Sequence, residues 1–158
     1  MKKQHDYALT VKWTGNQGTG TSHYKAFERS HTISINNKPD IYGSSDPAFR
    51  GDQTKYNPEE LFLSSLSSCH MLWYLHLCSE AHIIVTDYKD NATGIMEENS
   101  NGSGQFSEVT LNPIVTVTKE AMVAKAKALH TKANELCFIA NSVNFKVRHN
   151  SRCIVKEA

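Results

Sequence analysis

The sequence contains no hydrophobic run long enough to cross a membrane, and its first residues hold no apolar core of the kind found in export signals. It also lacks any tract of one charge, because 17 basic and 16 acidic residues are dispersed along the chain and leave a formal net charge of +1. Nucleic acids and anionic membranes attract proteins through clustered lysines and arginines, so we expect neither as a partner. The default expectation is a cytoplasmic protein.

The sequence lacks the Cys-x-x-Cys and His-x-x-x-His spacings that normally preset two ligands of a zinc ion. A zinc site built from Cys69, His70, His130 and Cys137 is therefore a minor alternative, and we expect neither a resident metal nor a bound cofactor. Four cysteines without an export signal indicate free thiols or a transient disulfide, because the cytosol keeps structural disulfides reduced.

With 158 residues and no internal repeat, the chain fits one domain, and we expect residues 1–158 to form it. Alternating apolar residues from Tyr7 to Trp13 predict a strand with one buried face, which a glycine-rich segment then ends. Residues 32–36 predict a second short strand. Residues 43–56 are expected to form a long irregular loop, and such loops in compact domains are usually functional or mobile.

A central helix is predicted after this loop. Asn57 at the N-cap, Pro58 at the first helical position and Glu60 three residues past the cap form a capping-box pattern. Apolar residues occupy most of the helix circumference up to about Ala81. We therefore expect burial on more than one side of this helix.

The remaining elements complete an α+β chain. Ile83–Tyr88 and Val109–Val117 predict strands, with residues 97–104 as a solvated loop between hairpin arms. Apolar residues recurring every three or four positions predict a second helix from about Lys119 to Cys137. A final strand is expected to begin at Val143 and to continue toward Val155. Two main helices packed against antiparallel strands define the α+β class.

Cys69 and Cys137 each lie in an apolar helical stretch, 68 positions apart. Such a pair can run a two-electron redox cycle, in which one thiol attacks an oxidant and the other resolves the product as a disulfide. Taken alone, a cysteine in an apolar helix is more often a small core residue than a nucleophile. We expect Cys78 and Cys153 to be core or surface thiols of that kind.

Three stretches accompany the cysteines: Asn57-Pro-Glu-Glu-Leu, the Ser-Ser-Cys that ends at Cys69, and the Asn-Ser-Val-Asn-Phe-Lys-Val that trails Cys137. They resemble the OsmC/Ohr family, the osmotically inducible and organic hydroperoxide resistance proteins, and the resemblance extends from about Tyr7 to Val155. It implies an intertwined homodimer with two long central helices and antiparallel sheets. It also implies a thiol peroxidase that reduces organic hydroperoxides and is restored by an external dithiol of the lipoyl type.

By this resemblance Cys69 is the peroxidatic cysteine and Cys137 is the resolving cysteine, while an arginine and a glutamate complete the site. Glu59 matches the family's glutamate. Arg50, in the loop before the helix, is our first choice for the arginine, although it is slightly displaced from the place where OsmC-type members carry theirs. Arg29 is the alternative, because Ohr-type members take their arginine from farther upstream.

The chemistry explains why an arginine is required. Only a thiolate attacks the O–O bond usefully, and apolar burial raises a thiol pKa above its ordinary value of about 8.5. Cys69 lies about twelve residues into its helix, where the helix dipole offers little. A guanidinium stays charged when desolvated and can contact sulfur, peroxide oxygen and carboxylate together.

Glu59 and Cys69 cannot be neighbours on one straight helix, because ten residues correspond to a rise of about 15 Å and an offset of about 80°. An arginine bridges them only if the helix bends near its serine-rich section, or if Glu59 and the arginine meet the Cys69 of another subunit. Without the resemblance, Glu59 would be a first-turn carboxylate favoured by the helix dipole, and Arg50 a solvated loop residue.

Three functions therefore stay open: the peroxidase, the zinc site, and a small-molecule or thiol-carrier binding domain without turnover. His70 points about 100° away from Cys69 on the helix, so we expect a packing or interface role for it rather than a catalytic one. His76 is expected to pack in the core. The sequence identifies neither the preferred peroxide nor the physiological reductant.

Overall fold

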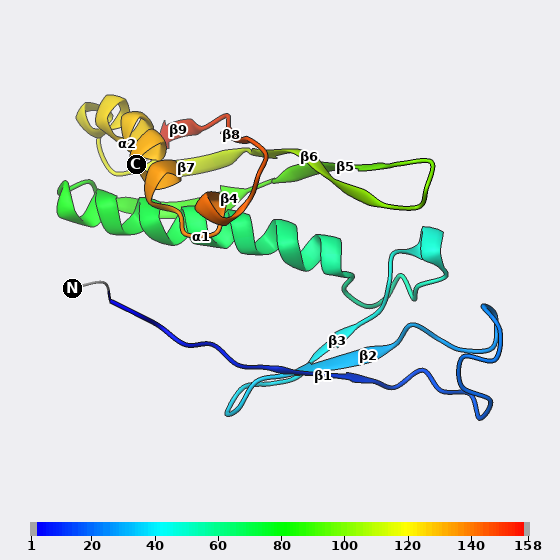
Figure 1. Ribbon diagram of the computed structural model, residues 1–158. Helices are drawn as coiled ribbons and strands as arrows, with labels where there is room; N and C mark the ends of the chain where they lie inside the picture. Colours follow the sequence, from blue (N-terminus) through cyan, green and yellow to red (C-terminus); the bar gives the residue numbers. More distant parts are fainter. Residues whose placement is uncertain (1–2, 157–158) are drawn as a thin grey trace. The chain divides into compact units, whose positions relative to one another are not determined.

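In the computed structural model, which describes residues 3–156, the chain divides into an N-terminal unit that ends at Leu61 and a C-terminal unit that begins at Phe62 (Figure 1). In chain order, with η for a short 3₁₀ helix, the elements are β1 (Thr10–Trp13), β2 (His31–Ser34), β3 (Ile41–Gly43), η1 (Pro47–Phe49), α1 (Pro58–Glu80), β4 (Val85–Asp90), β5 (Thr93–Glu98), β6 (Gly104–Leu111), β7 (Pro113–Val117), η2 (Glu120–Met122), α2 (Val123–Leu136), η3 (Ala140–Ser142), β8 (Val147–His149) and β9 (Arg152–Val155). This mixture of helices and strands confirms the α+β class. None of the helices in the described part of the chain has the length and apolar character needed to span a membrane.

The N-terminal unit is built on an antiparallel sheet with the strand order β1-β2-β3. Strand β1 confirms the end of the strand expected from Tyr7 to Trp13, but it begins only at Thr10. The expected buried face of this strand is wrong for the chain alone, because Leu9 and Val11 are each 59% exposed. Three strands cannot bury both of their own faces, so an apolar face of this sheet needs a second layer.

The loop expected over residues 43–56 contains the 3₁₀ helix η1. The carboxylate of Asp46 caps η1 by accepting a backbone N–H at 2.7 Å. Arg50 ends η1 with a φ of +66°, in the left-handed region that few non-glycine residues adopt. Gly51 follows because a Cβ at this position would lie 1.5 Å from the carbonyl oxygen of Ser45. The turn therefore fixes the backbone at Arg50.

Helix α1 begins as the sequence predicts. The side chain of Asn57 accepts a hydrogen bond from the Glu60 N–H at 2.8 Å, and the Glu60 carboxylate accepts one from the Asn57 N–H at 3.0 Å. These two bonds form the reciprocal capping box, with Pro58 at the first helical position. The helix ends at Glu80, one residue before the expected Ala81.

Full burial along α1 is confined to one stripe, whose members stand four residues apart: Leu66, His70, Tyr74 and Cys78. The expectation of burial on more than one side is therefore wrong for the chain by itself. Leu72, on another face of the helix, is 63% exposed because no layer of the described chain covers it fully.

The C-terminal unit contains two three-stranded sheets, with the strand orders β4-β7-β9 and β5-β6-β8. The strand expected over residues 109–117 is broken at Asn112, so that its halves belong to different sheets. The break is caused by a side chain from another strand. The Asp90 carboxylate accepts the Asn112 N–H at 2.7 Å and also the hydroxyl of Ser67. A side chain thus takes the N–H that would otherwise enter the strand ladder.

Two further expectations need correction. Strand β5 was not expected, and it shortens the loop assigned to residues 97–104, because β5 reaches Glu98 and β6 begins at Gly104. All of its side chains are exposed, so it lacks the alternation that identifies a half-buried strand.

The sheets are also not wholly antiparallel, since β8 pairs with β6 and β9 pairs with β7 in parallel. Helix α2 lies in the crossover that such parallel pairs require.

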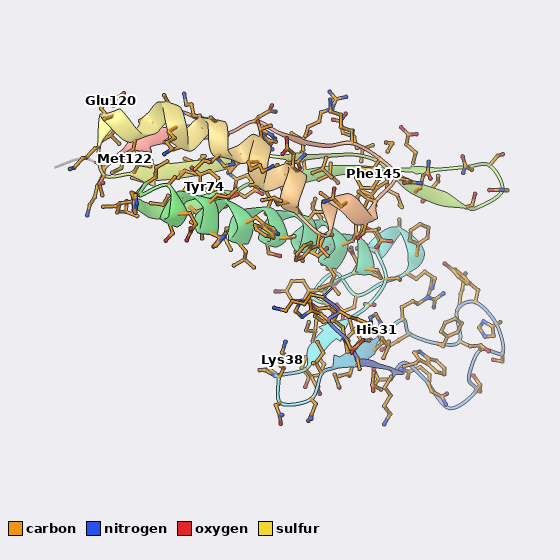
Figure 2. The ribbon with its side chains drawn as sticks, turned by 60° about the vertical axis from the view of Figure 1, so that its left-hand side comes forward. His31, Lys38, Tyr74, Glu120, Met122 and Phe145 are labelled. Atoms are coloured by element: carbon orange, nitrogen blue, oxygen red, sulfur yellow. The ribbon has the colours of Figure 1, made fainter. Side chains whose placement is uncertain are left out.

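The second helix is confirmed as η2 followed by α2, with Cys137 as its C-cap. The final strand expected from Val143 toward Val155 is instead two strands of different sheets, β8 from Val147 and β9 from Arg152. Residues 143–146 lie outside any strand, where Val143 and Phe145 pack against an apolar cluster. Figure 2 labels Phe145.

Two apolar clusters form the core of the C-terminal unit, and α1 contributes to both. The buried members of the first are Tyr74, Cys78, Ile83, Val115, Val117, Ala126 and Ala133. The buried members of the second are Leu66, Val109, Leu111 and Val147. The helix is therefore held along the sheets of this unit, and the segment between the clusters carries Cys69.

Candidate functional site

The two candidate cysteines meet inside the C-terminal unit. Cys69 is partly buried midway along α1, and Cys137 is buried at the C-terminal end of α2. Their side chains are close enough for Cys69 to influence the pKa of Cys137, and neither takes part in a disulfide. Proximity of two free thiols is the arrangement that disulfide formation requires.

The surroundings of Cys137 keep its thiol protonated. Burial, and then the neighbouring thiol of Cys69, raise the pKa of Cys137 to about 11. The backbone N–H groups of Ala140 and Ile139 oppose this rise only in part, and that of Ala140 lies 3.4 Å from the sulfur. A nucleophilic cysteine must supply a thiolate, so Cys137 is the less suitable of the two thiols for a first attack.

Cys69 lines a cleft of about 580 Å³. The contributing residues of α1 recur at helical spacing and so form one face of the helix; the complete lining is Ser65, Ser68, Cys69, Leu72, Trp73, His76, Phe138 and Ile139. The hydroxyls of Ser65 and Ser68 donate to backbone carbonyls of α1 itself, at 2.7 and 2.8 Å. Their polarity is thus used within the helix, and the cleft presents mainly apolar surface.

Aromatic side chains form one wall of this cleft. Trp73 packs edge to face against Phe138, with ring centroids 5.5 Å apart, and against His76 at 5.8 Å. Phe138 is nevertheless 68% exposed, so the wall is open on one side. The expectation that His76 packs in the core is wrong: it is exposed at the cleft, because seven residues place it on the same helix face as Cys69.

Glu59 lies in the first turn of α1, within the N-terminal unit. Ten residues of one uninterrupted helix separate it from Cys69, a rise of about 15 Å, so the two side chains are not neighbours. One oxygen of the Glu59 carboxylate is buried and has no hydrogen-bond partner within residues 3–156. A buried carboxylate oxygen without a donor is costly, so a guanidinium placed there would stabilise it.

The two candidate arginines line the same cavity of the N-terminal unit, which has a volume of about 250 Å³. Arg29 is already occupied: it donates to the carbonyl oxygens of Phe27 and of Tyr24, and its guanidinium lies 4.2 and 4.4 Å from the centres of those two rings. Arg50 is exposed, and its guanidinium has no hydrogen-bond or ion-pair partner in the described chain. Of the two, Arg50 is the one free to bind a new anionic group.

The zinc alternative does not assemble. His70 and His130 are hydrogen-bonded to each other, which occupies the facing nitrogen of each ring. Within the described residues, no group of three or more histidine, cysteine or acidic side chains is arranged to hold a metal ion.

Comparison with known proteins identifies the family. The sequence model of the family described as OsmC-like protein matches residues 51–152. The chain belongs to the OsmC-like family. A search among curated proteins finds no match.

Solved structures agree with this assignment. An OsmC-like protein of unknown function from Vibrio cholerae is 30% identical, with a TM-score of 0.84, over 94% of this chain and all of that one. An organic hydroperoxide resistance protein from Legionella pneumophila is 17% identical, with a TM-score of 0.68, over 97% of this chain and all of that one. A third, OhrB of Bacillus subtilis, is 22% identical, with a TM-score of 0.60, over 93% and 98% of the two chains. At these lower identities the last two establish a shared fold.

The other two thiols of this OsmC-like chain lie away from the cleft. Cys78 is buried and Cys153 is partly buried against the same apolar cluster, as expected for core thiols. Burial raises the pKa of both. Each therefore remains protonated and unreactive near neutral pH.

Sequence reasoning missed the residues that shape the cleft of this OsmC-like chain. Leu72 and Trp73 were expected in the core, as part of the apolar circumference of the helix, and Phe138 was given no role. A spacing signal could have distinguished the cleft residues of α1 from its core residues. The cleft residues share one helix face, opposite the buried stripe: Ser65, Ser68, Cys69, Leu72, Trp73 and His76.

Proposed function

We propose that this protein is a cysteine-based peroxidase that reduces organic hydroperoxides to alcohols, with Cys69 as the peroxidatic and Cys137 as the resolving cysteine. The observation that carries the proposal is the proximity of these two free thiols beside an apolar cleft. The free thiols also fit a cytoplasmic site of action, where such groups stay reduced.

The reaction balances with the residues named. The Cys69 thiolate attacks one oxygen of the hydroperoxide, the O–O bond breaks, and the alkoxide leaves as an alcohol after taking a proton. Cys69 is then a sulfenic acid, oxidised by two electrons. The thiol of Cys137 attacks that sulfur, an S–S bond forms, and the hydroxyl of the sulfenic acid leaves with the thiol proton as water. An external dithiol returns two electrons and two protons by thiol–disulfide exchange.

The cleft supports an organic substrate over hydrogen peroxide. Its apolar lining stabilises the hydrocarbon part of a hydroperoxide by removing it from water, while hydrogen peroxide has no such part. The names of the Legionella and Bacillus relatives, organic hydroperoxide resistance proteins, point to the same substrate class. For the reductant we propose a dithiol of the lipoyl type.

A steady-state assay tests this proposal against a binding domain without turnover. We expect the protein to consume an alkyl hydroperoxide with dihydrolipoamide as reductant, and to consume hydrogen peroxide more slowly. Binding of the peroxide without any oxidation of dihydrolipoamide would reject the peroxidase.

We propose Arg50 as the cation that activates Cys69, and Glu59 as the carboxylate that holds that cation in place. The free guanidinium of Arg50 and the buried oxygen of Glu59 without a donor support this pairing. The occupied guanidinium of Arg29 makes that residue the less suitable one.

Exchange of Arg50 is expected to slow the attack. Arg50→Ala should slow alkylation of Cys69 near neutral pH by at least about tenfold, which corresponds to about 1.4 kcal/mol. Arg50→Lys should rescue it poorly, because a point charge does not offer the planar fork that binds carboxylate and sulfur together. Glu59→Gln should slow attack without abolishing it, since the cation remains present. The measurement is the pH dependence of Cys69 alkylation, and Arg29→Ala is the matched control. A shift in the Arg29→Ala curve with none in Arg50→Ala would transfer the role to Arg29.

We also propose that the whole chain acts as one domain within an intertwined homodimer. Large apolar side chains remain more than half exposed in the described chain: Leu9, just before β1, Val11 on β1, and Leu72 and Phe138 at the cleft. A second copy would bury them, and exposed apolar surface of this kind commonly marks an association site.

Sedimentation at micromolar concentration should therefore give the mass of two chains. Val11→Lys should move the equilibrium toward monomer, because it places a charge on the face to be covered. Lys12→Ala, on the neighbouring position of the same strand, is the control and should leave the dimer intact. A stable folded monomer of the wild type would contradict the proposal.

A further inference from the structure

A pair of buried histidines joins the two helices that carry the cysteines. His70 follows Cys69 on α1, and His130 stands seven residues before Cys137, two helical turns, on α2. The side chains of both histidines are 0% exposed. The Nε2 atom of His70 lies 2.9 Å from the Nδ1 atom of His130, within hydrogen-bond distance.

The two imidazoles meet edge to edge. Their planes differ by 4° and their centroids are 5.3 Å apart, whereas Tyr74 lies face to face on His130 at only 3.9 Å. Edge-to-edge contact in one plane points the donated N–H at the acceptor lone pair, which is the favourable geometry for a hydrogen bond. Figure 2 labels Tyr74 where α1 lies beside α2.

This pair is costly for the stability of the core. The outer nitrogens, Nδ1 of His70 and Nε2 of His130, are buried without a hydrogen-bond partner in the described chain. Each such atom costs about 1–3 kcal/mol, and replacement of both partners by apolar groups of the same shape can be nearly neutral or stabilising. The histidines therefore need a reason other than stability.

The surroundings suggest that reason. The other fully buried residues of α2 are Ala126 and Ala133, whose small apolar side chains tolerate sliding of one helix along the other. A hydrogen bond does not tolerate such sliding, because an added separation of less than about 1 Å between donor and acceptor removes it. A disulfide is equally demanding, since it requires Cβ atoms about 3.5–4.5 Å apart.

We propose that His70 and His130 are positioning residues, whose mutual hydrogen bond fixes the register of α1 against α2 and so holds Cys137 against Cys69 for disulfide formation. The proposal rests on the peroxidase function proposed above and assigns the pair to its resolving step. It leaves the first attack by Cys69 unaffected.

The bond requires one ring to supply an N–H donor and the other to be neutral, so that its nitrogen can accept. Burial lowers the pKa of His70 to about 4 and of His130 to about 3, which keeps both neutral near pH 7. The titratable groups that face the pair are His149, from β8, and Tyr74, from α1. Burial lowers the pKa of His149 and raises that of Tyr74, so neither brings a charge to the pair.

The test measures how readily the two cysteines form a disulfide without any peroxide. Full-length protein is equilibrated with reduced and oxidised glutathione, and the Cys69–Cys137 bond is quantified by mass mapping. The fraction of bonded protein at each glutathione ratio gives the effective concentration of the Cys137 thiol at Cys69. His130→Phe keeps a flat ring against Tyr74 but removes the hydrogen bond. It should lower that concentration about tenfold, the equivalent of one hydrogen bond.

Two matched variants make the result specific. The double variant His70→Gln with His130→Asn places amide groups near the original nitrogens, so it should restore the effective concentration to within about threefold of wild type. Val109→Ala removes buried volume from the second cluster and should lower the melting temperature without changing the thiol equilibrium. An unchanged equilibrium in His130→Phe, a failed restoration in the double variant, or an equal loss in Val109→Ala would each overturn the proposal.

The outcome is separable from that of the peroxidase assay. A chain that consumes no hydroperoxide but loses its disulfide in His130→Phe would reject the peroxidase and retain the pair as a device that aligns thiols. A chain that consumes hydroperoxide with an unchanged thiol equilibrium in His130→Phe would retain the peroxidase and reject the positioning role.

Discussion

Cys69→Ser is expected to abolish hydroperoxide consumption, while Cys137→Ser is expected to permit a single turnover. The first variant lacks the sulfur that attacks the O–O bond, and a serine hydroxyl is not a substitute because it does not pass through a sulfenic acid. The loss should be complete within the detection limit of the dihydrolipoamide assay. The variant should remain folded, since Cys69 is only partly buried and serine is smaller.

Cys137→Ser separates attack from resolution. Its Cys69 should consume one equivalent of hydroperoxide and then remain a sulfenic acid with no neighbouring thiol to condense with. Excess hydroperoxide should carry it to sulfinic and sulfonic acid, visible by mass as added oxygens on the peptide that contains Cys69.

Cys78→Ser and Cys153→Ser are the matched controls. Both residues are protonated core thiols away from the cleft, so each variant should turn over like the wild type. A disulfide that involves either of them in oxidised wild-type protein would show that the resolving thiol has been misassigned.

The start of α1 could be predicted from the sequence because its signal is local. The capping box of Asn57 and Glu60 involves residues three apart, and the observed hydrogen bonds form between the same groups. The exposed strand β5 and the break at Asn112 could not be predicted, since the first lacks a buried face and the second depends on Asp90, 22 positions away.

The candidate site divides in the same way. The flanks of Cys69 and Cys137 marked them as a pair, whereas their proximity depends on how α1 and α2 pack. The hydrogen bond between His70 and His130 joins residues 60 positions apart and has no sequence pattern at all. Arg29 and Arg50 line the same cavity. They differ in that carbonyl groups and aromatic rings surround Arg29, and this difference arises only in the folded structure.

The same histidines predict a loss of stability in mild acid. Burial lowers the pKa of His70 to about 4 and of His130 to about 3, from an ordinary value of 6.5. The unfolded chain therefore binds protons before the folded chain does. The stability that the two neutral histidines contribute to the folded state is fully present above about pH 6.5. It is lost as the pH falls from there toward the pKa values of the folded state.

The expected size follows from the pKa difference. At about pH 5 the solution lies about 1.5 units below the unfolded pKa and above both folded values, so each ring costs about 2 kcal/mol and the pair up to about 4 kcal/mol. Urea unfolding at fixed protein concentration, at about pH 7.5 and pH 5, measures this loss. The double variant His70→Gln with His130→Asn has no imidazole at either position and is the matched control. Between these two pH values, the unfolding free energy of the double variant should fall by several kcal/mol less than that of the wild type. Every other titrating group is common to both proteins, so its effect cancels. Equal losses in the two proteins would show that the pair is not held neutral by the fold.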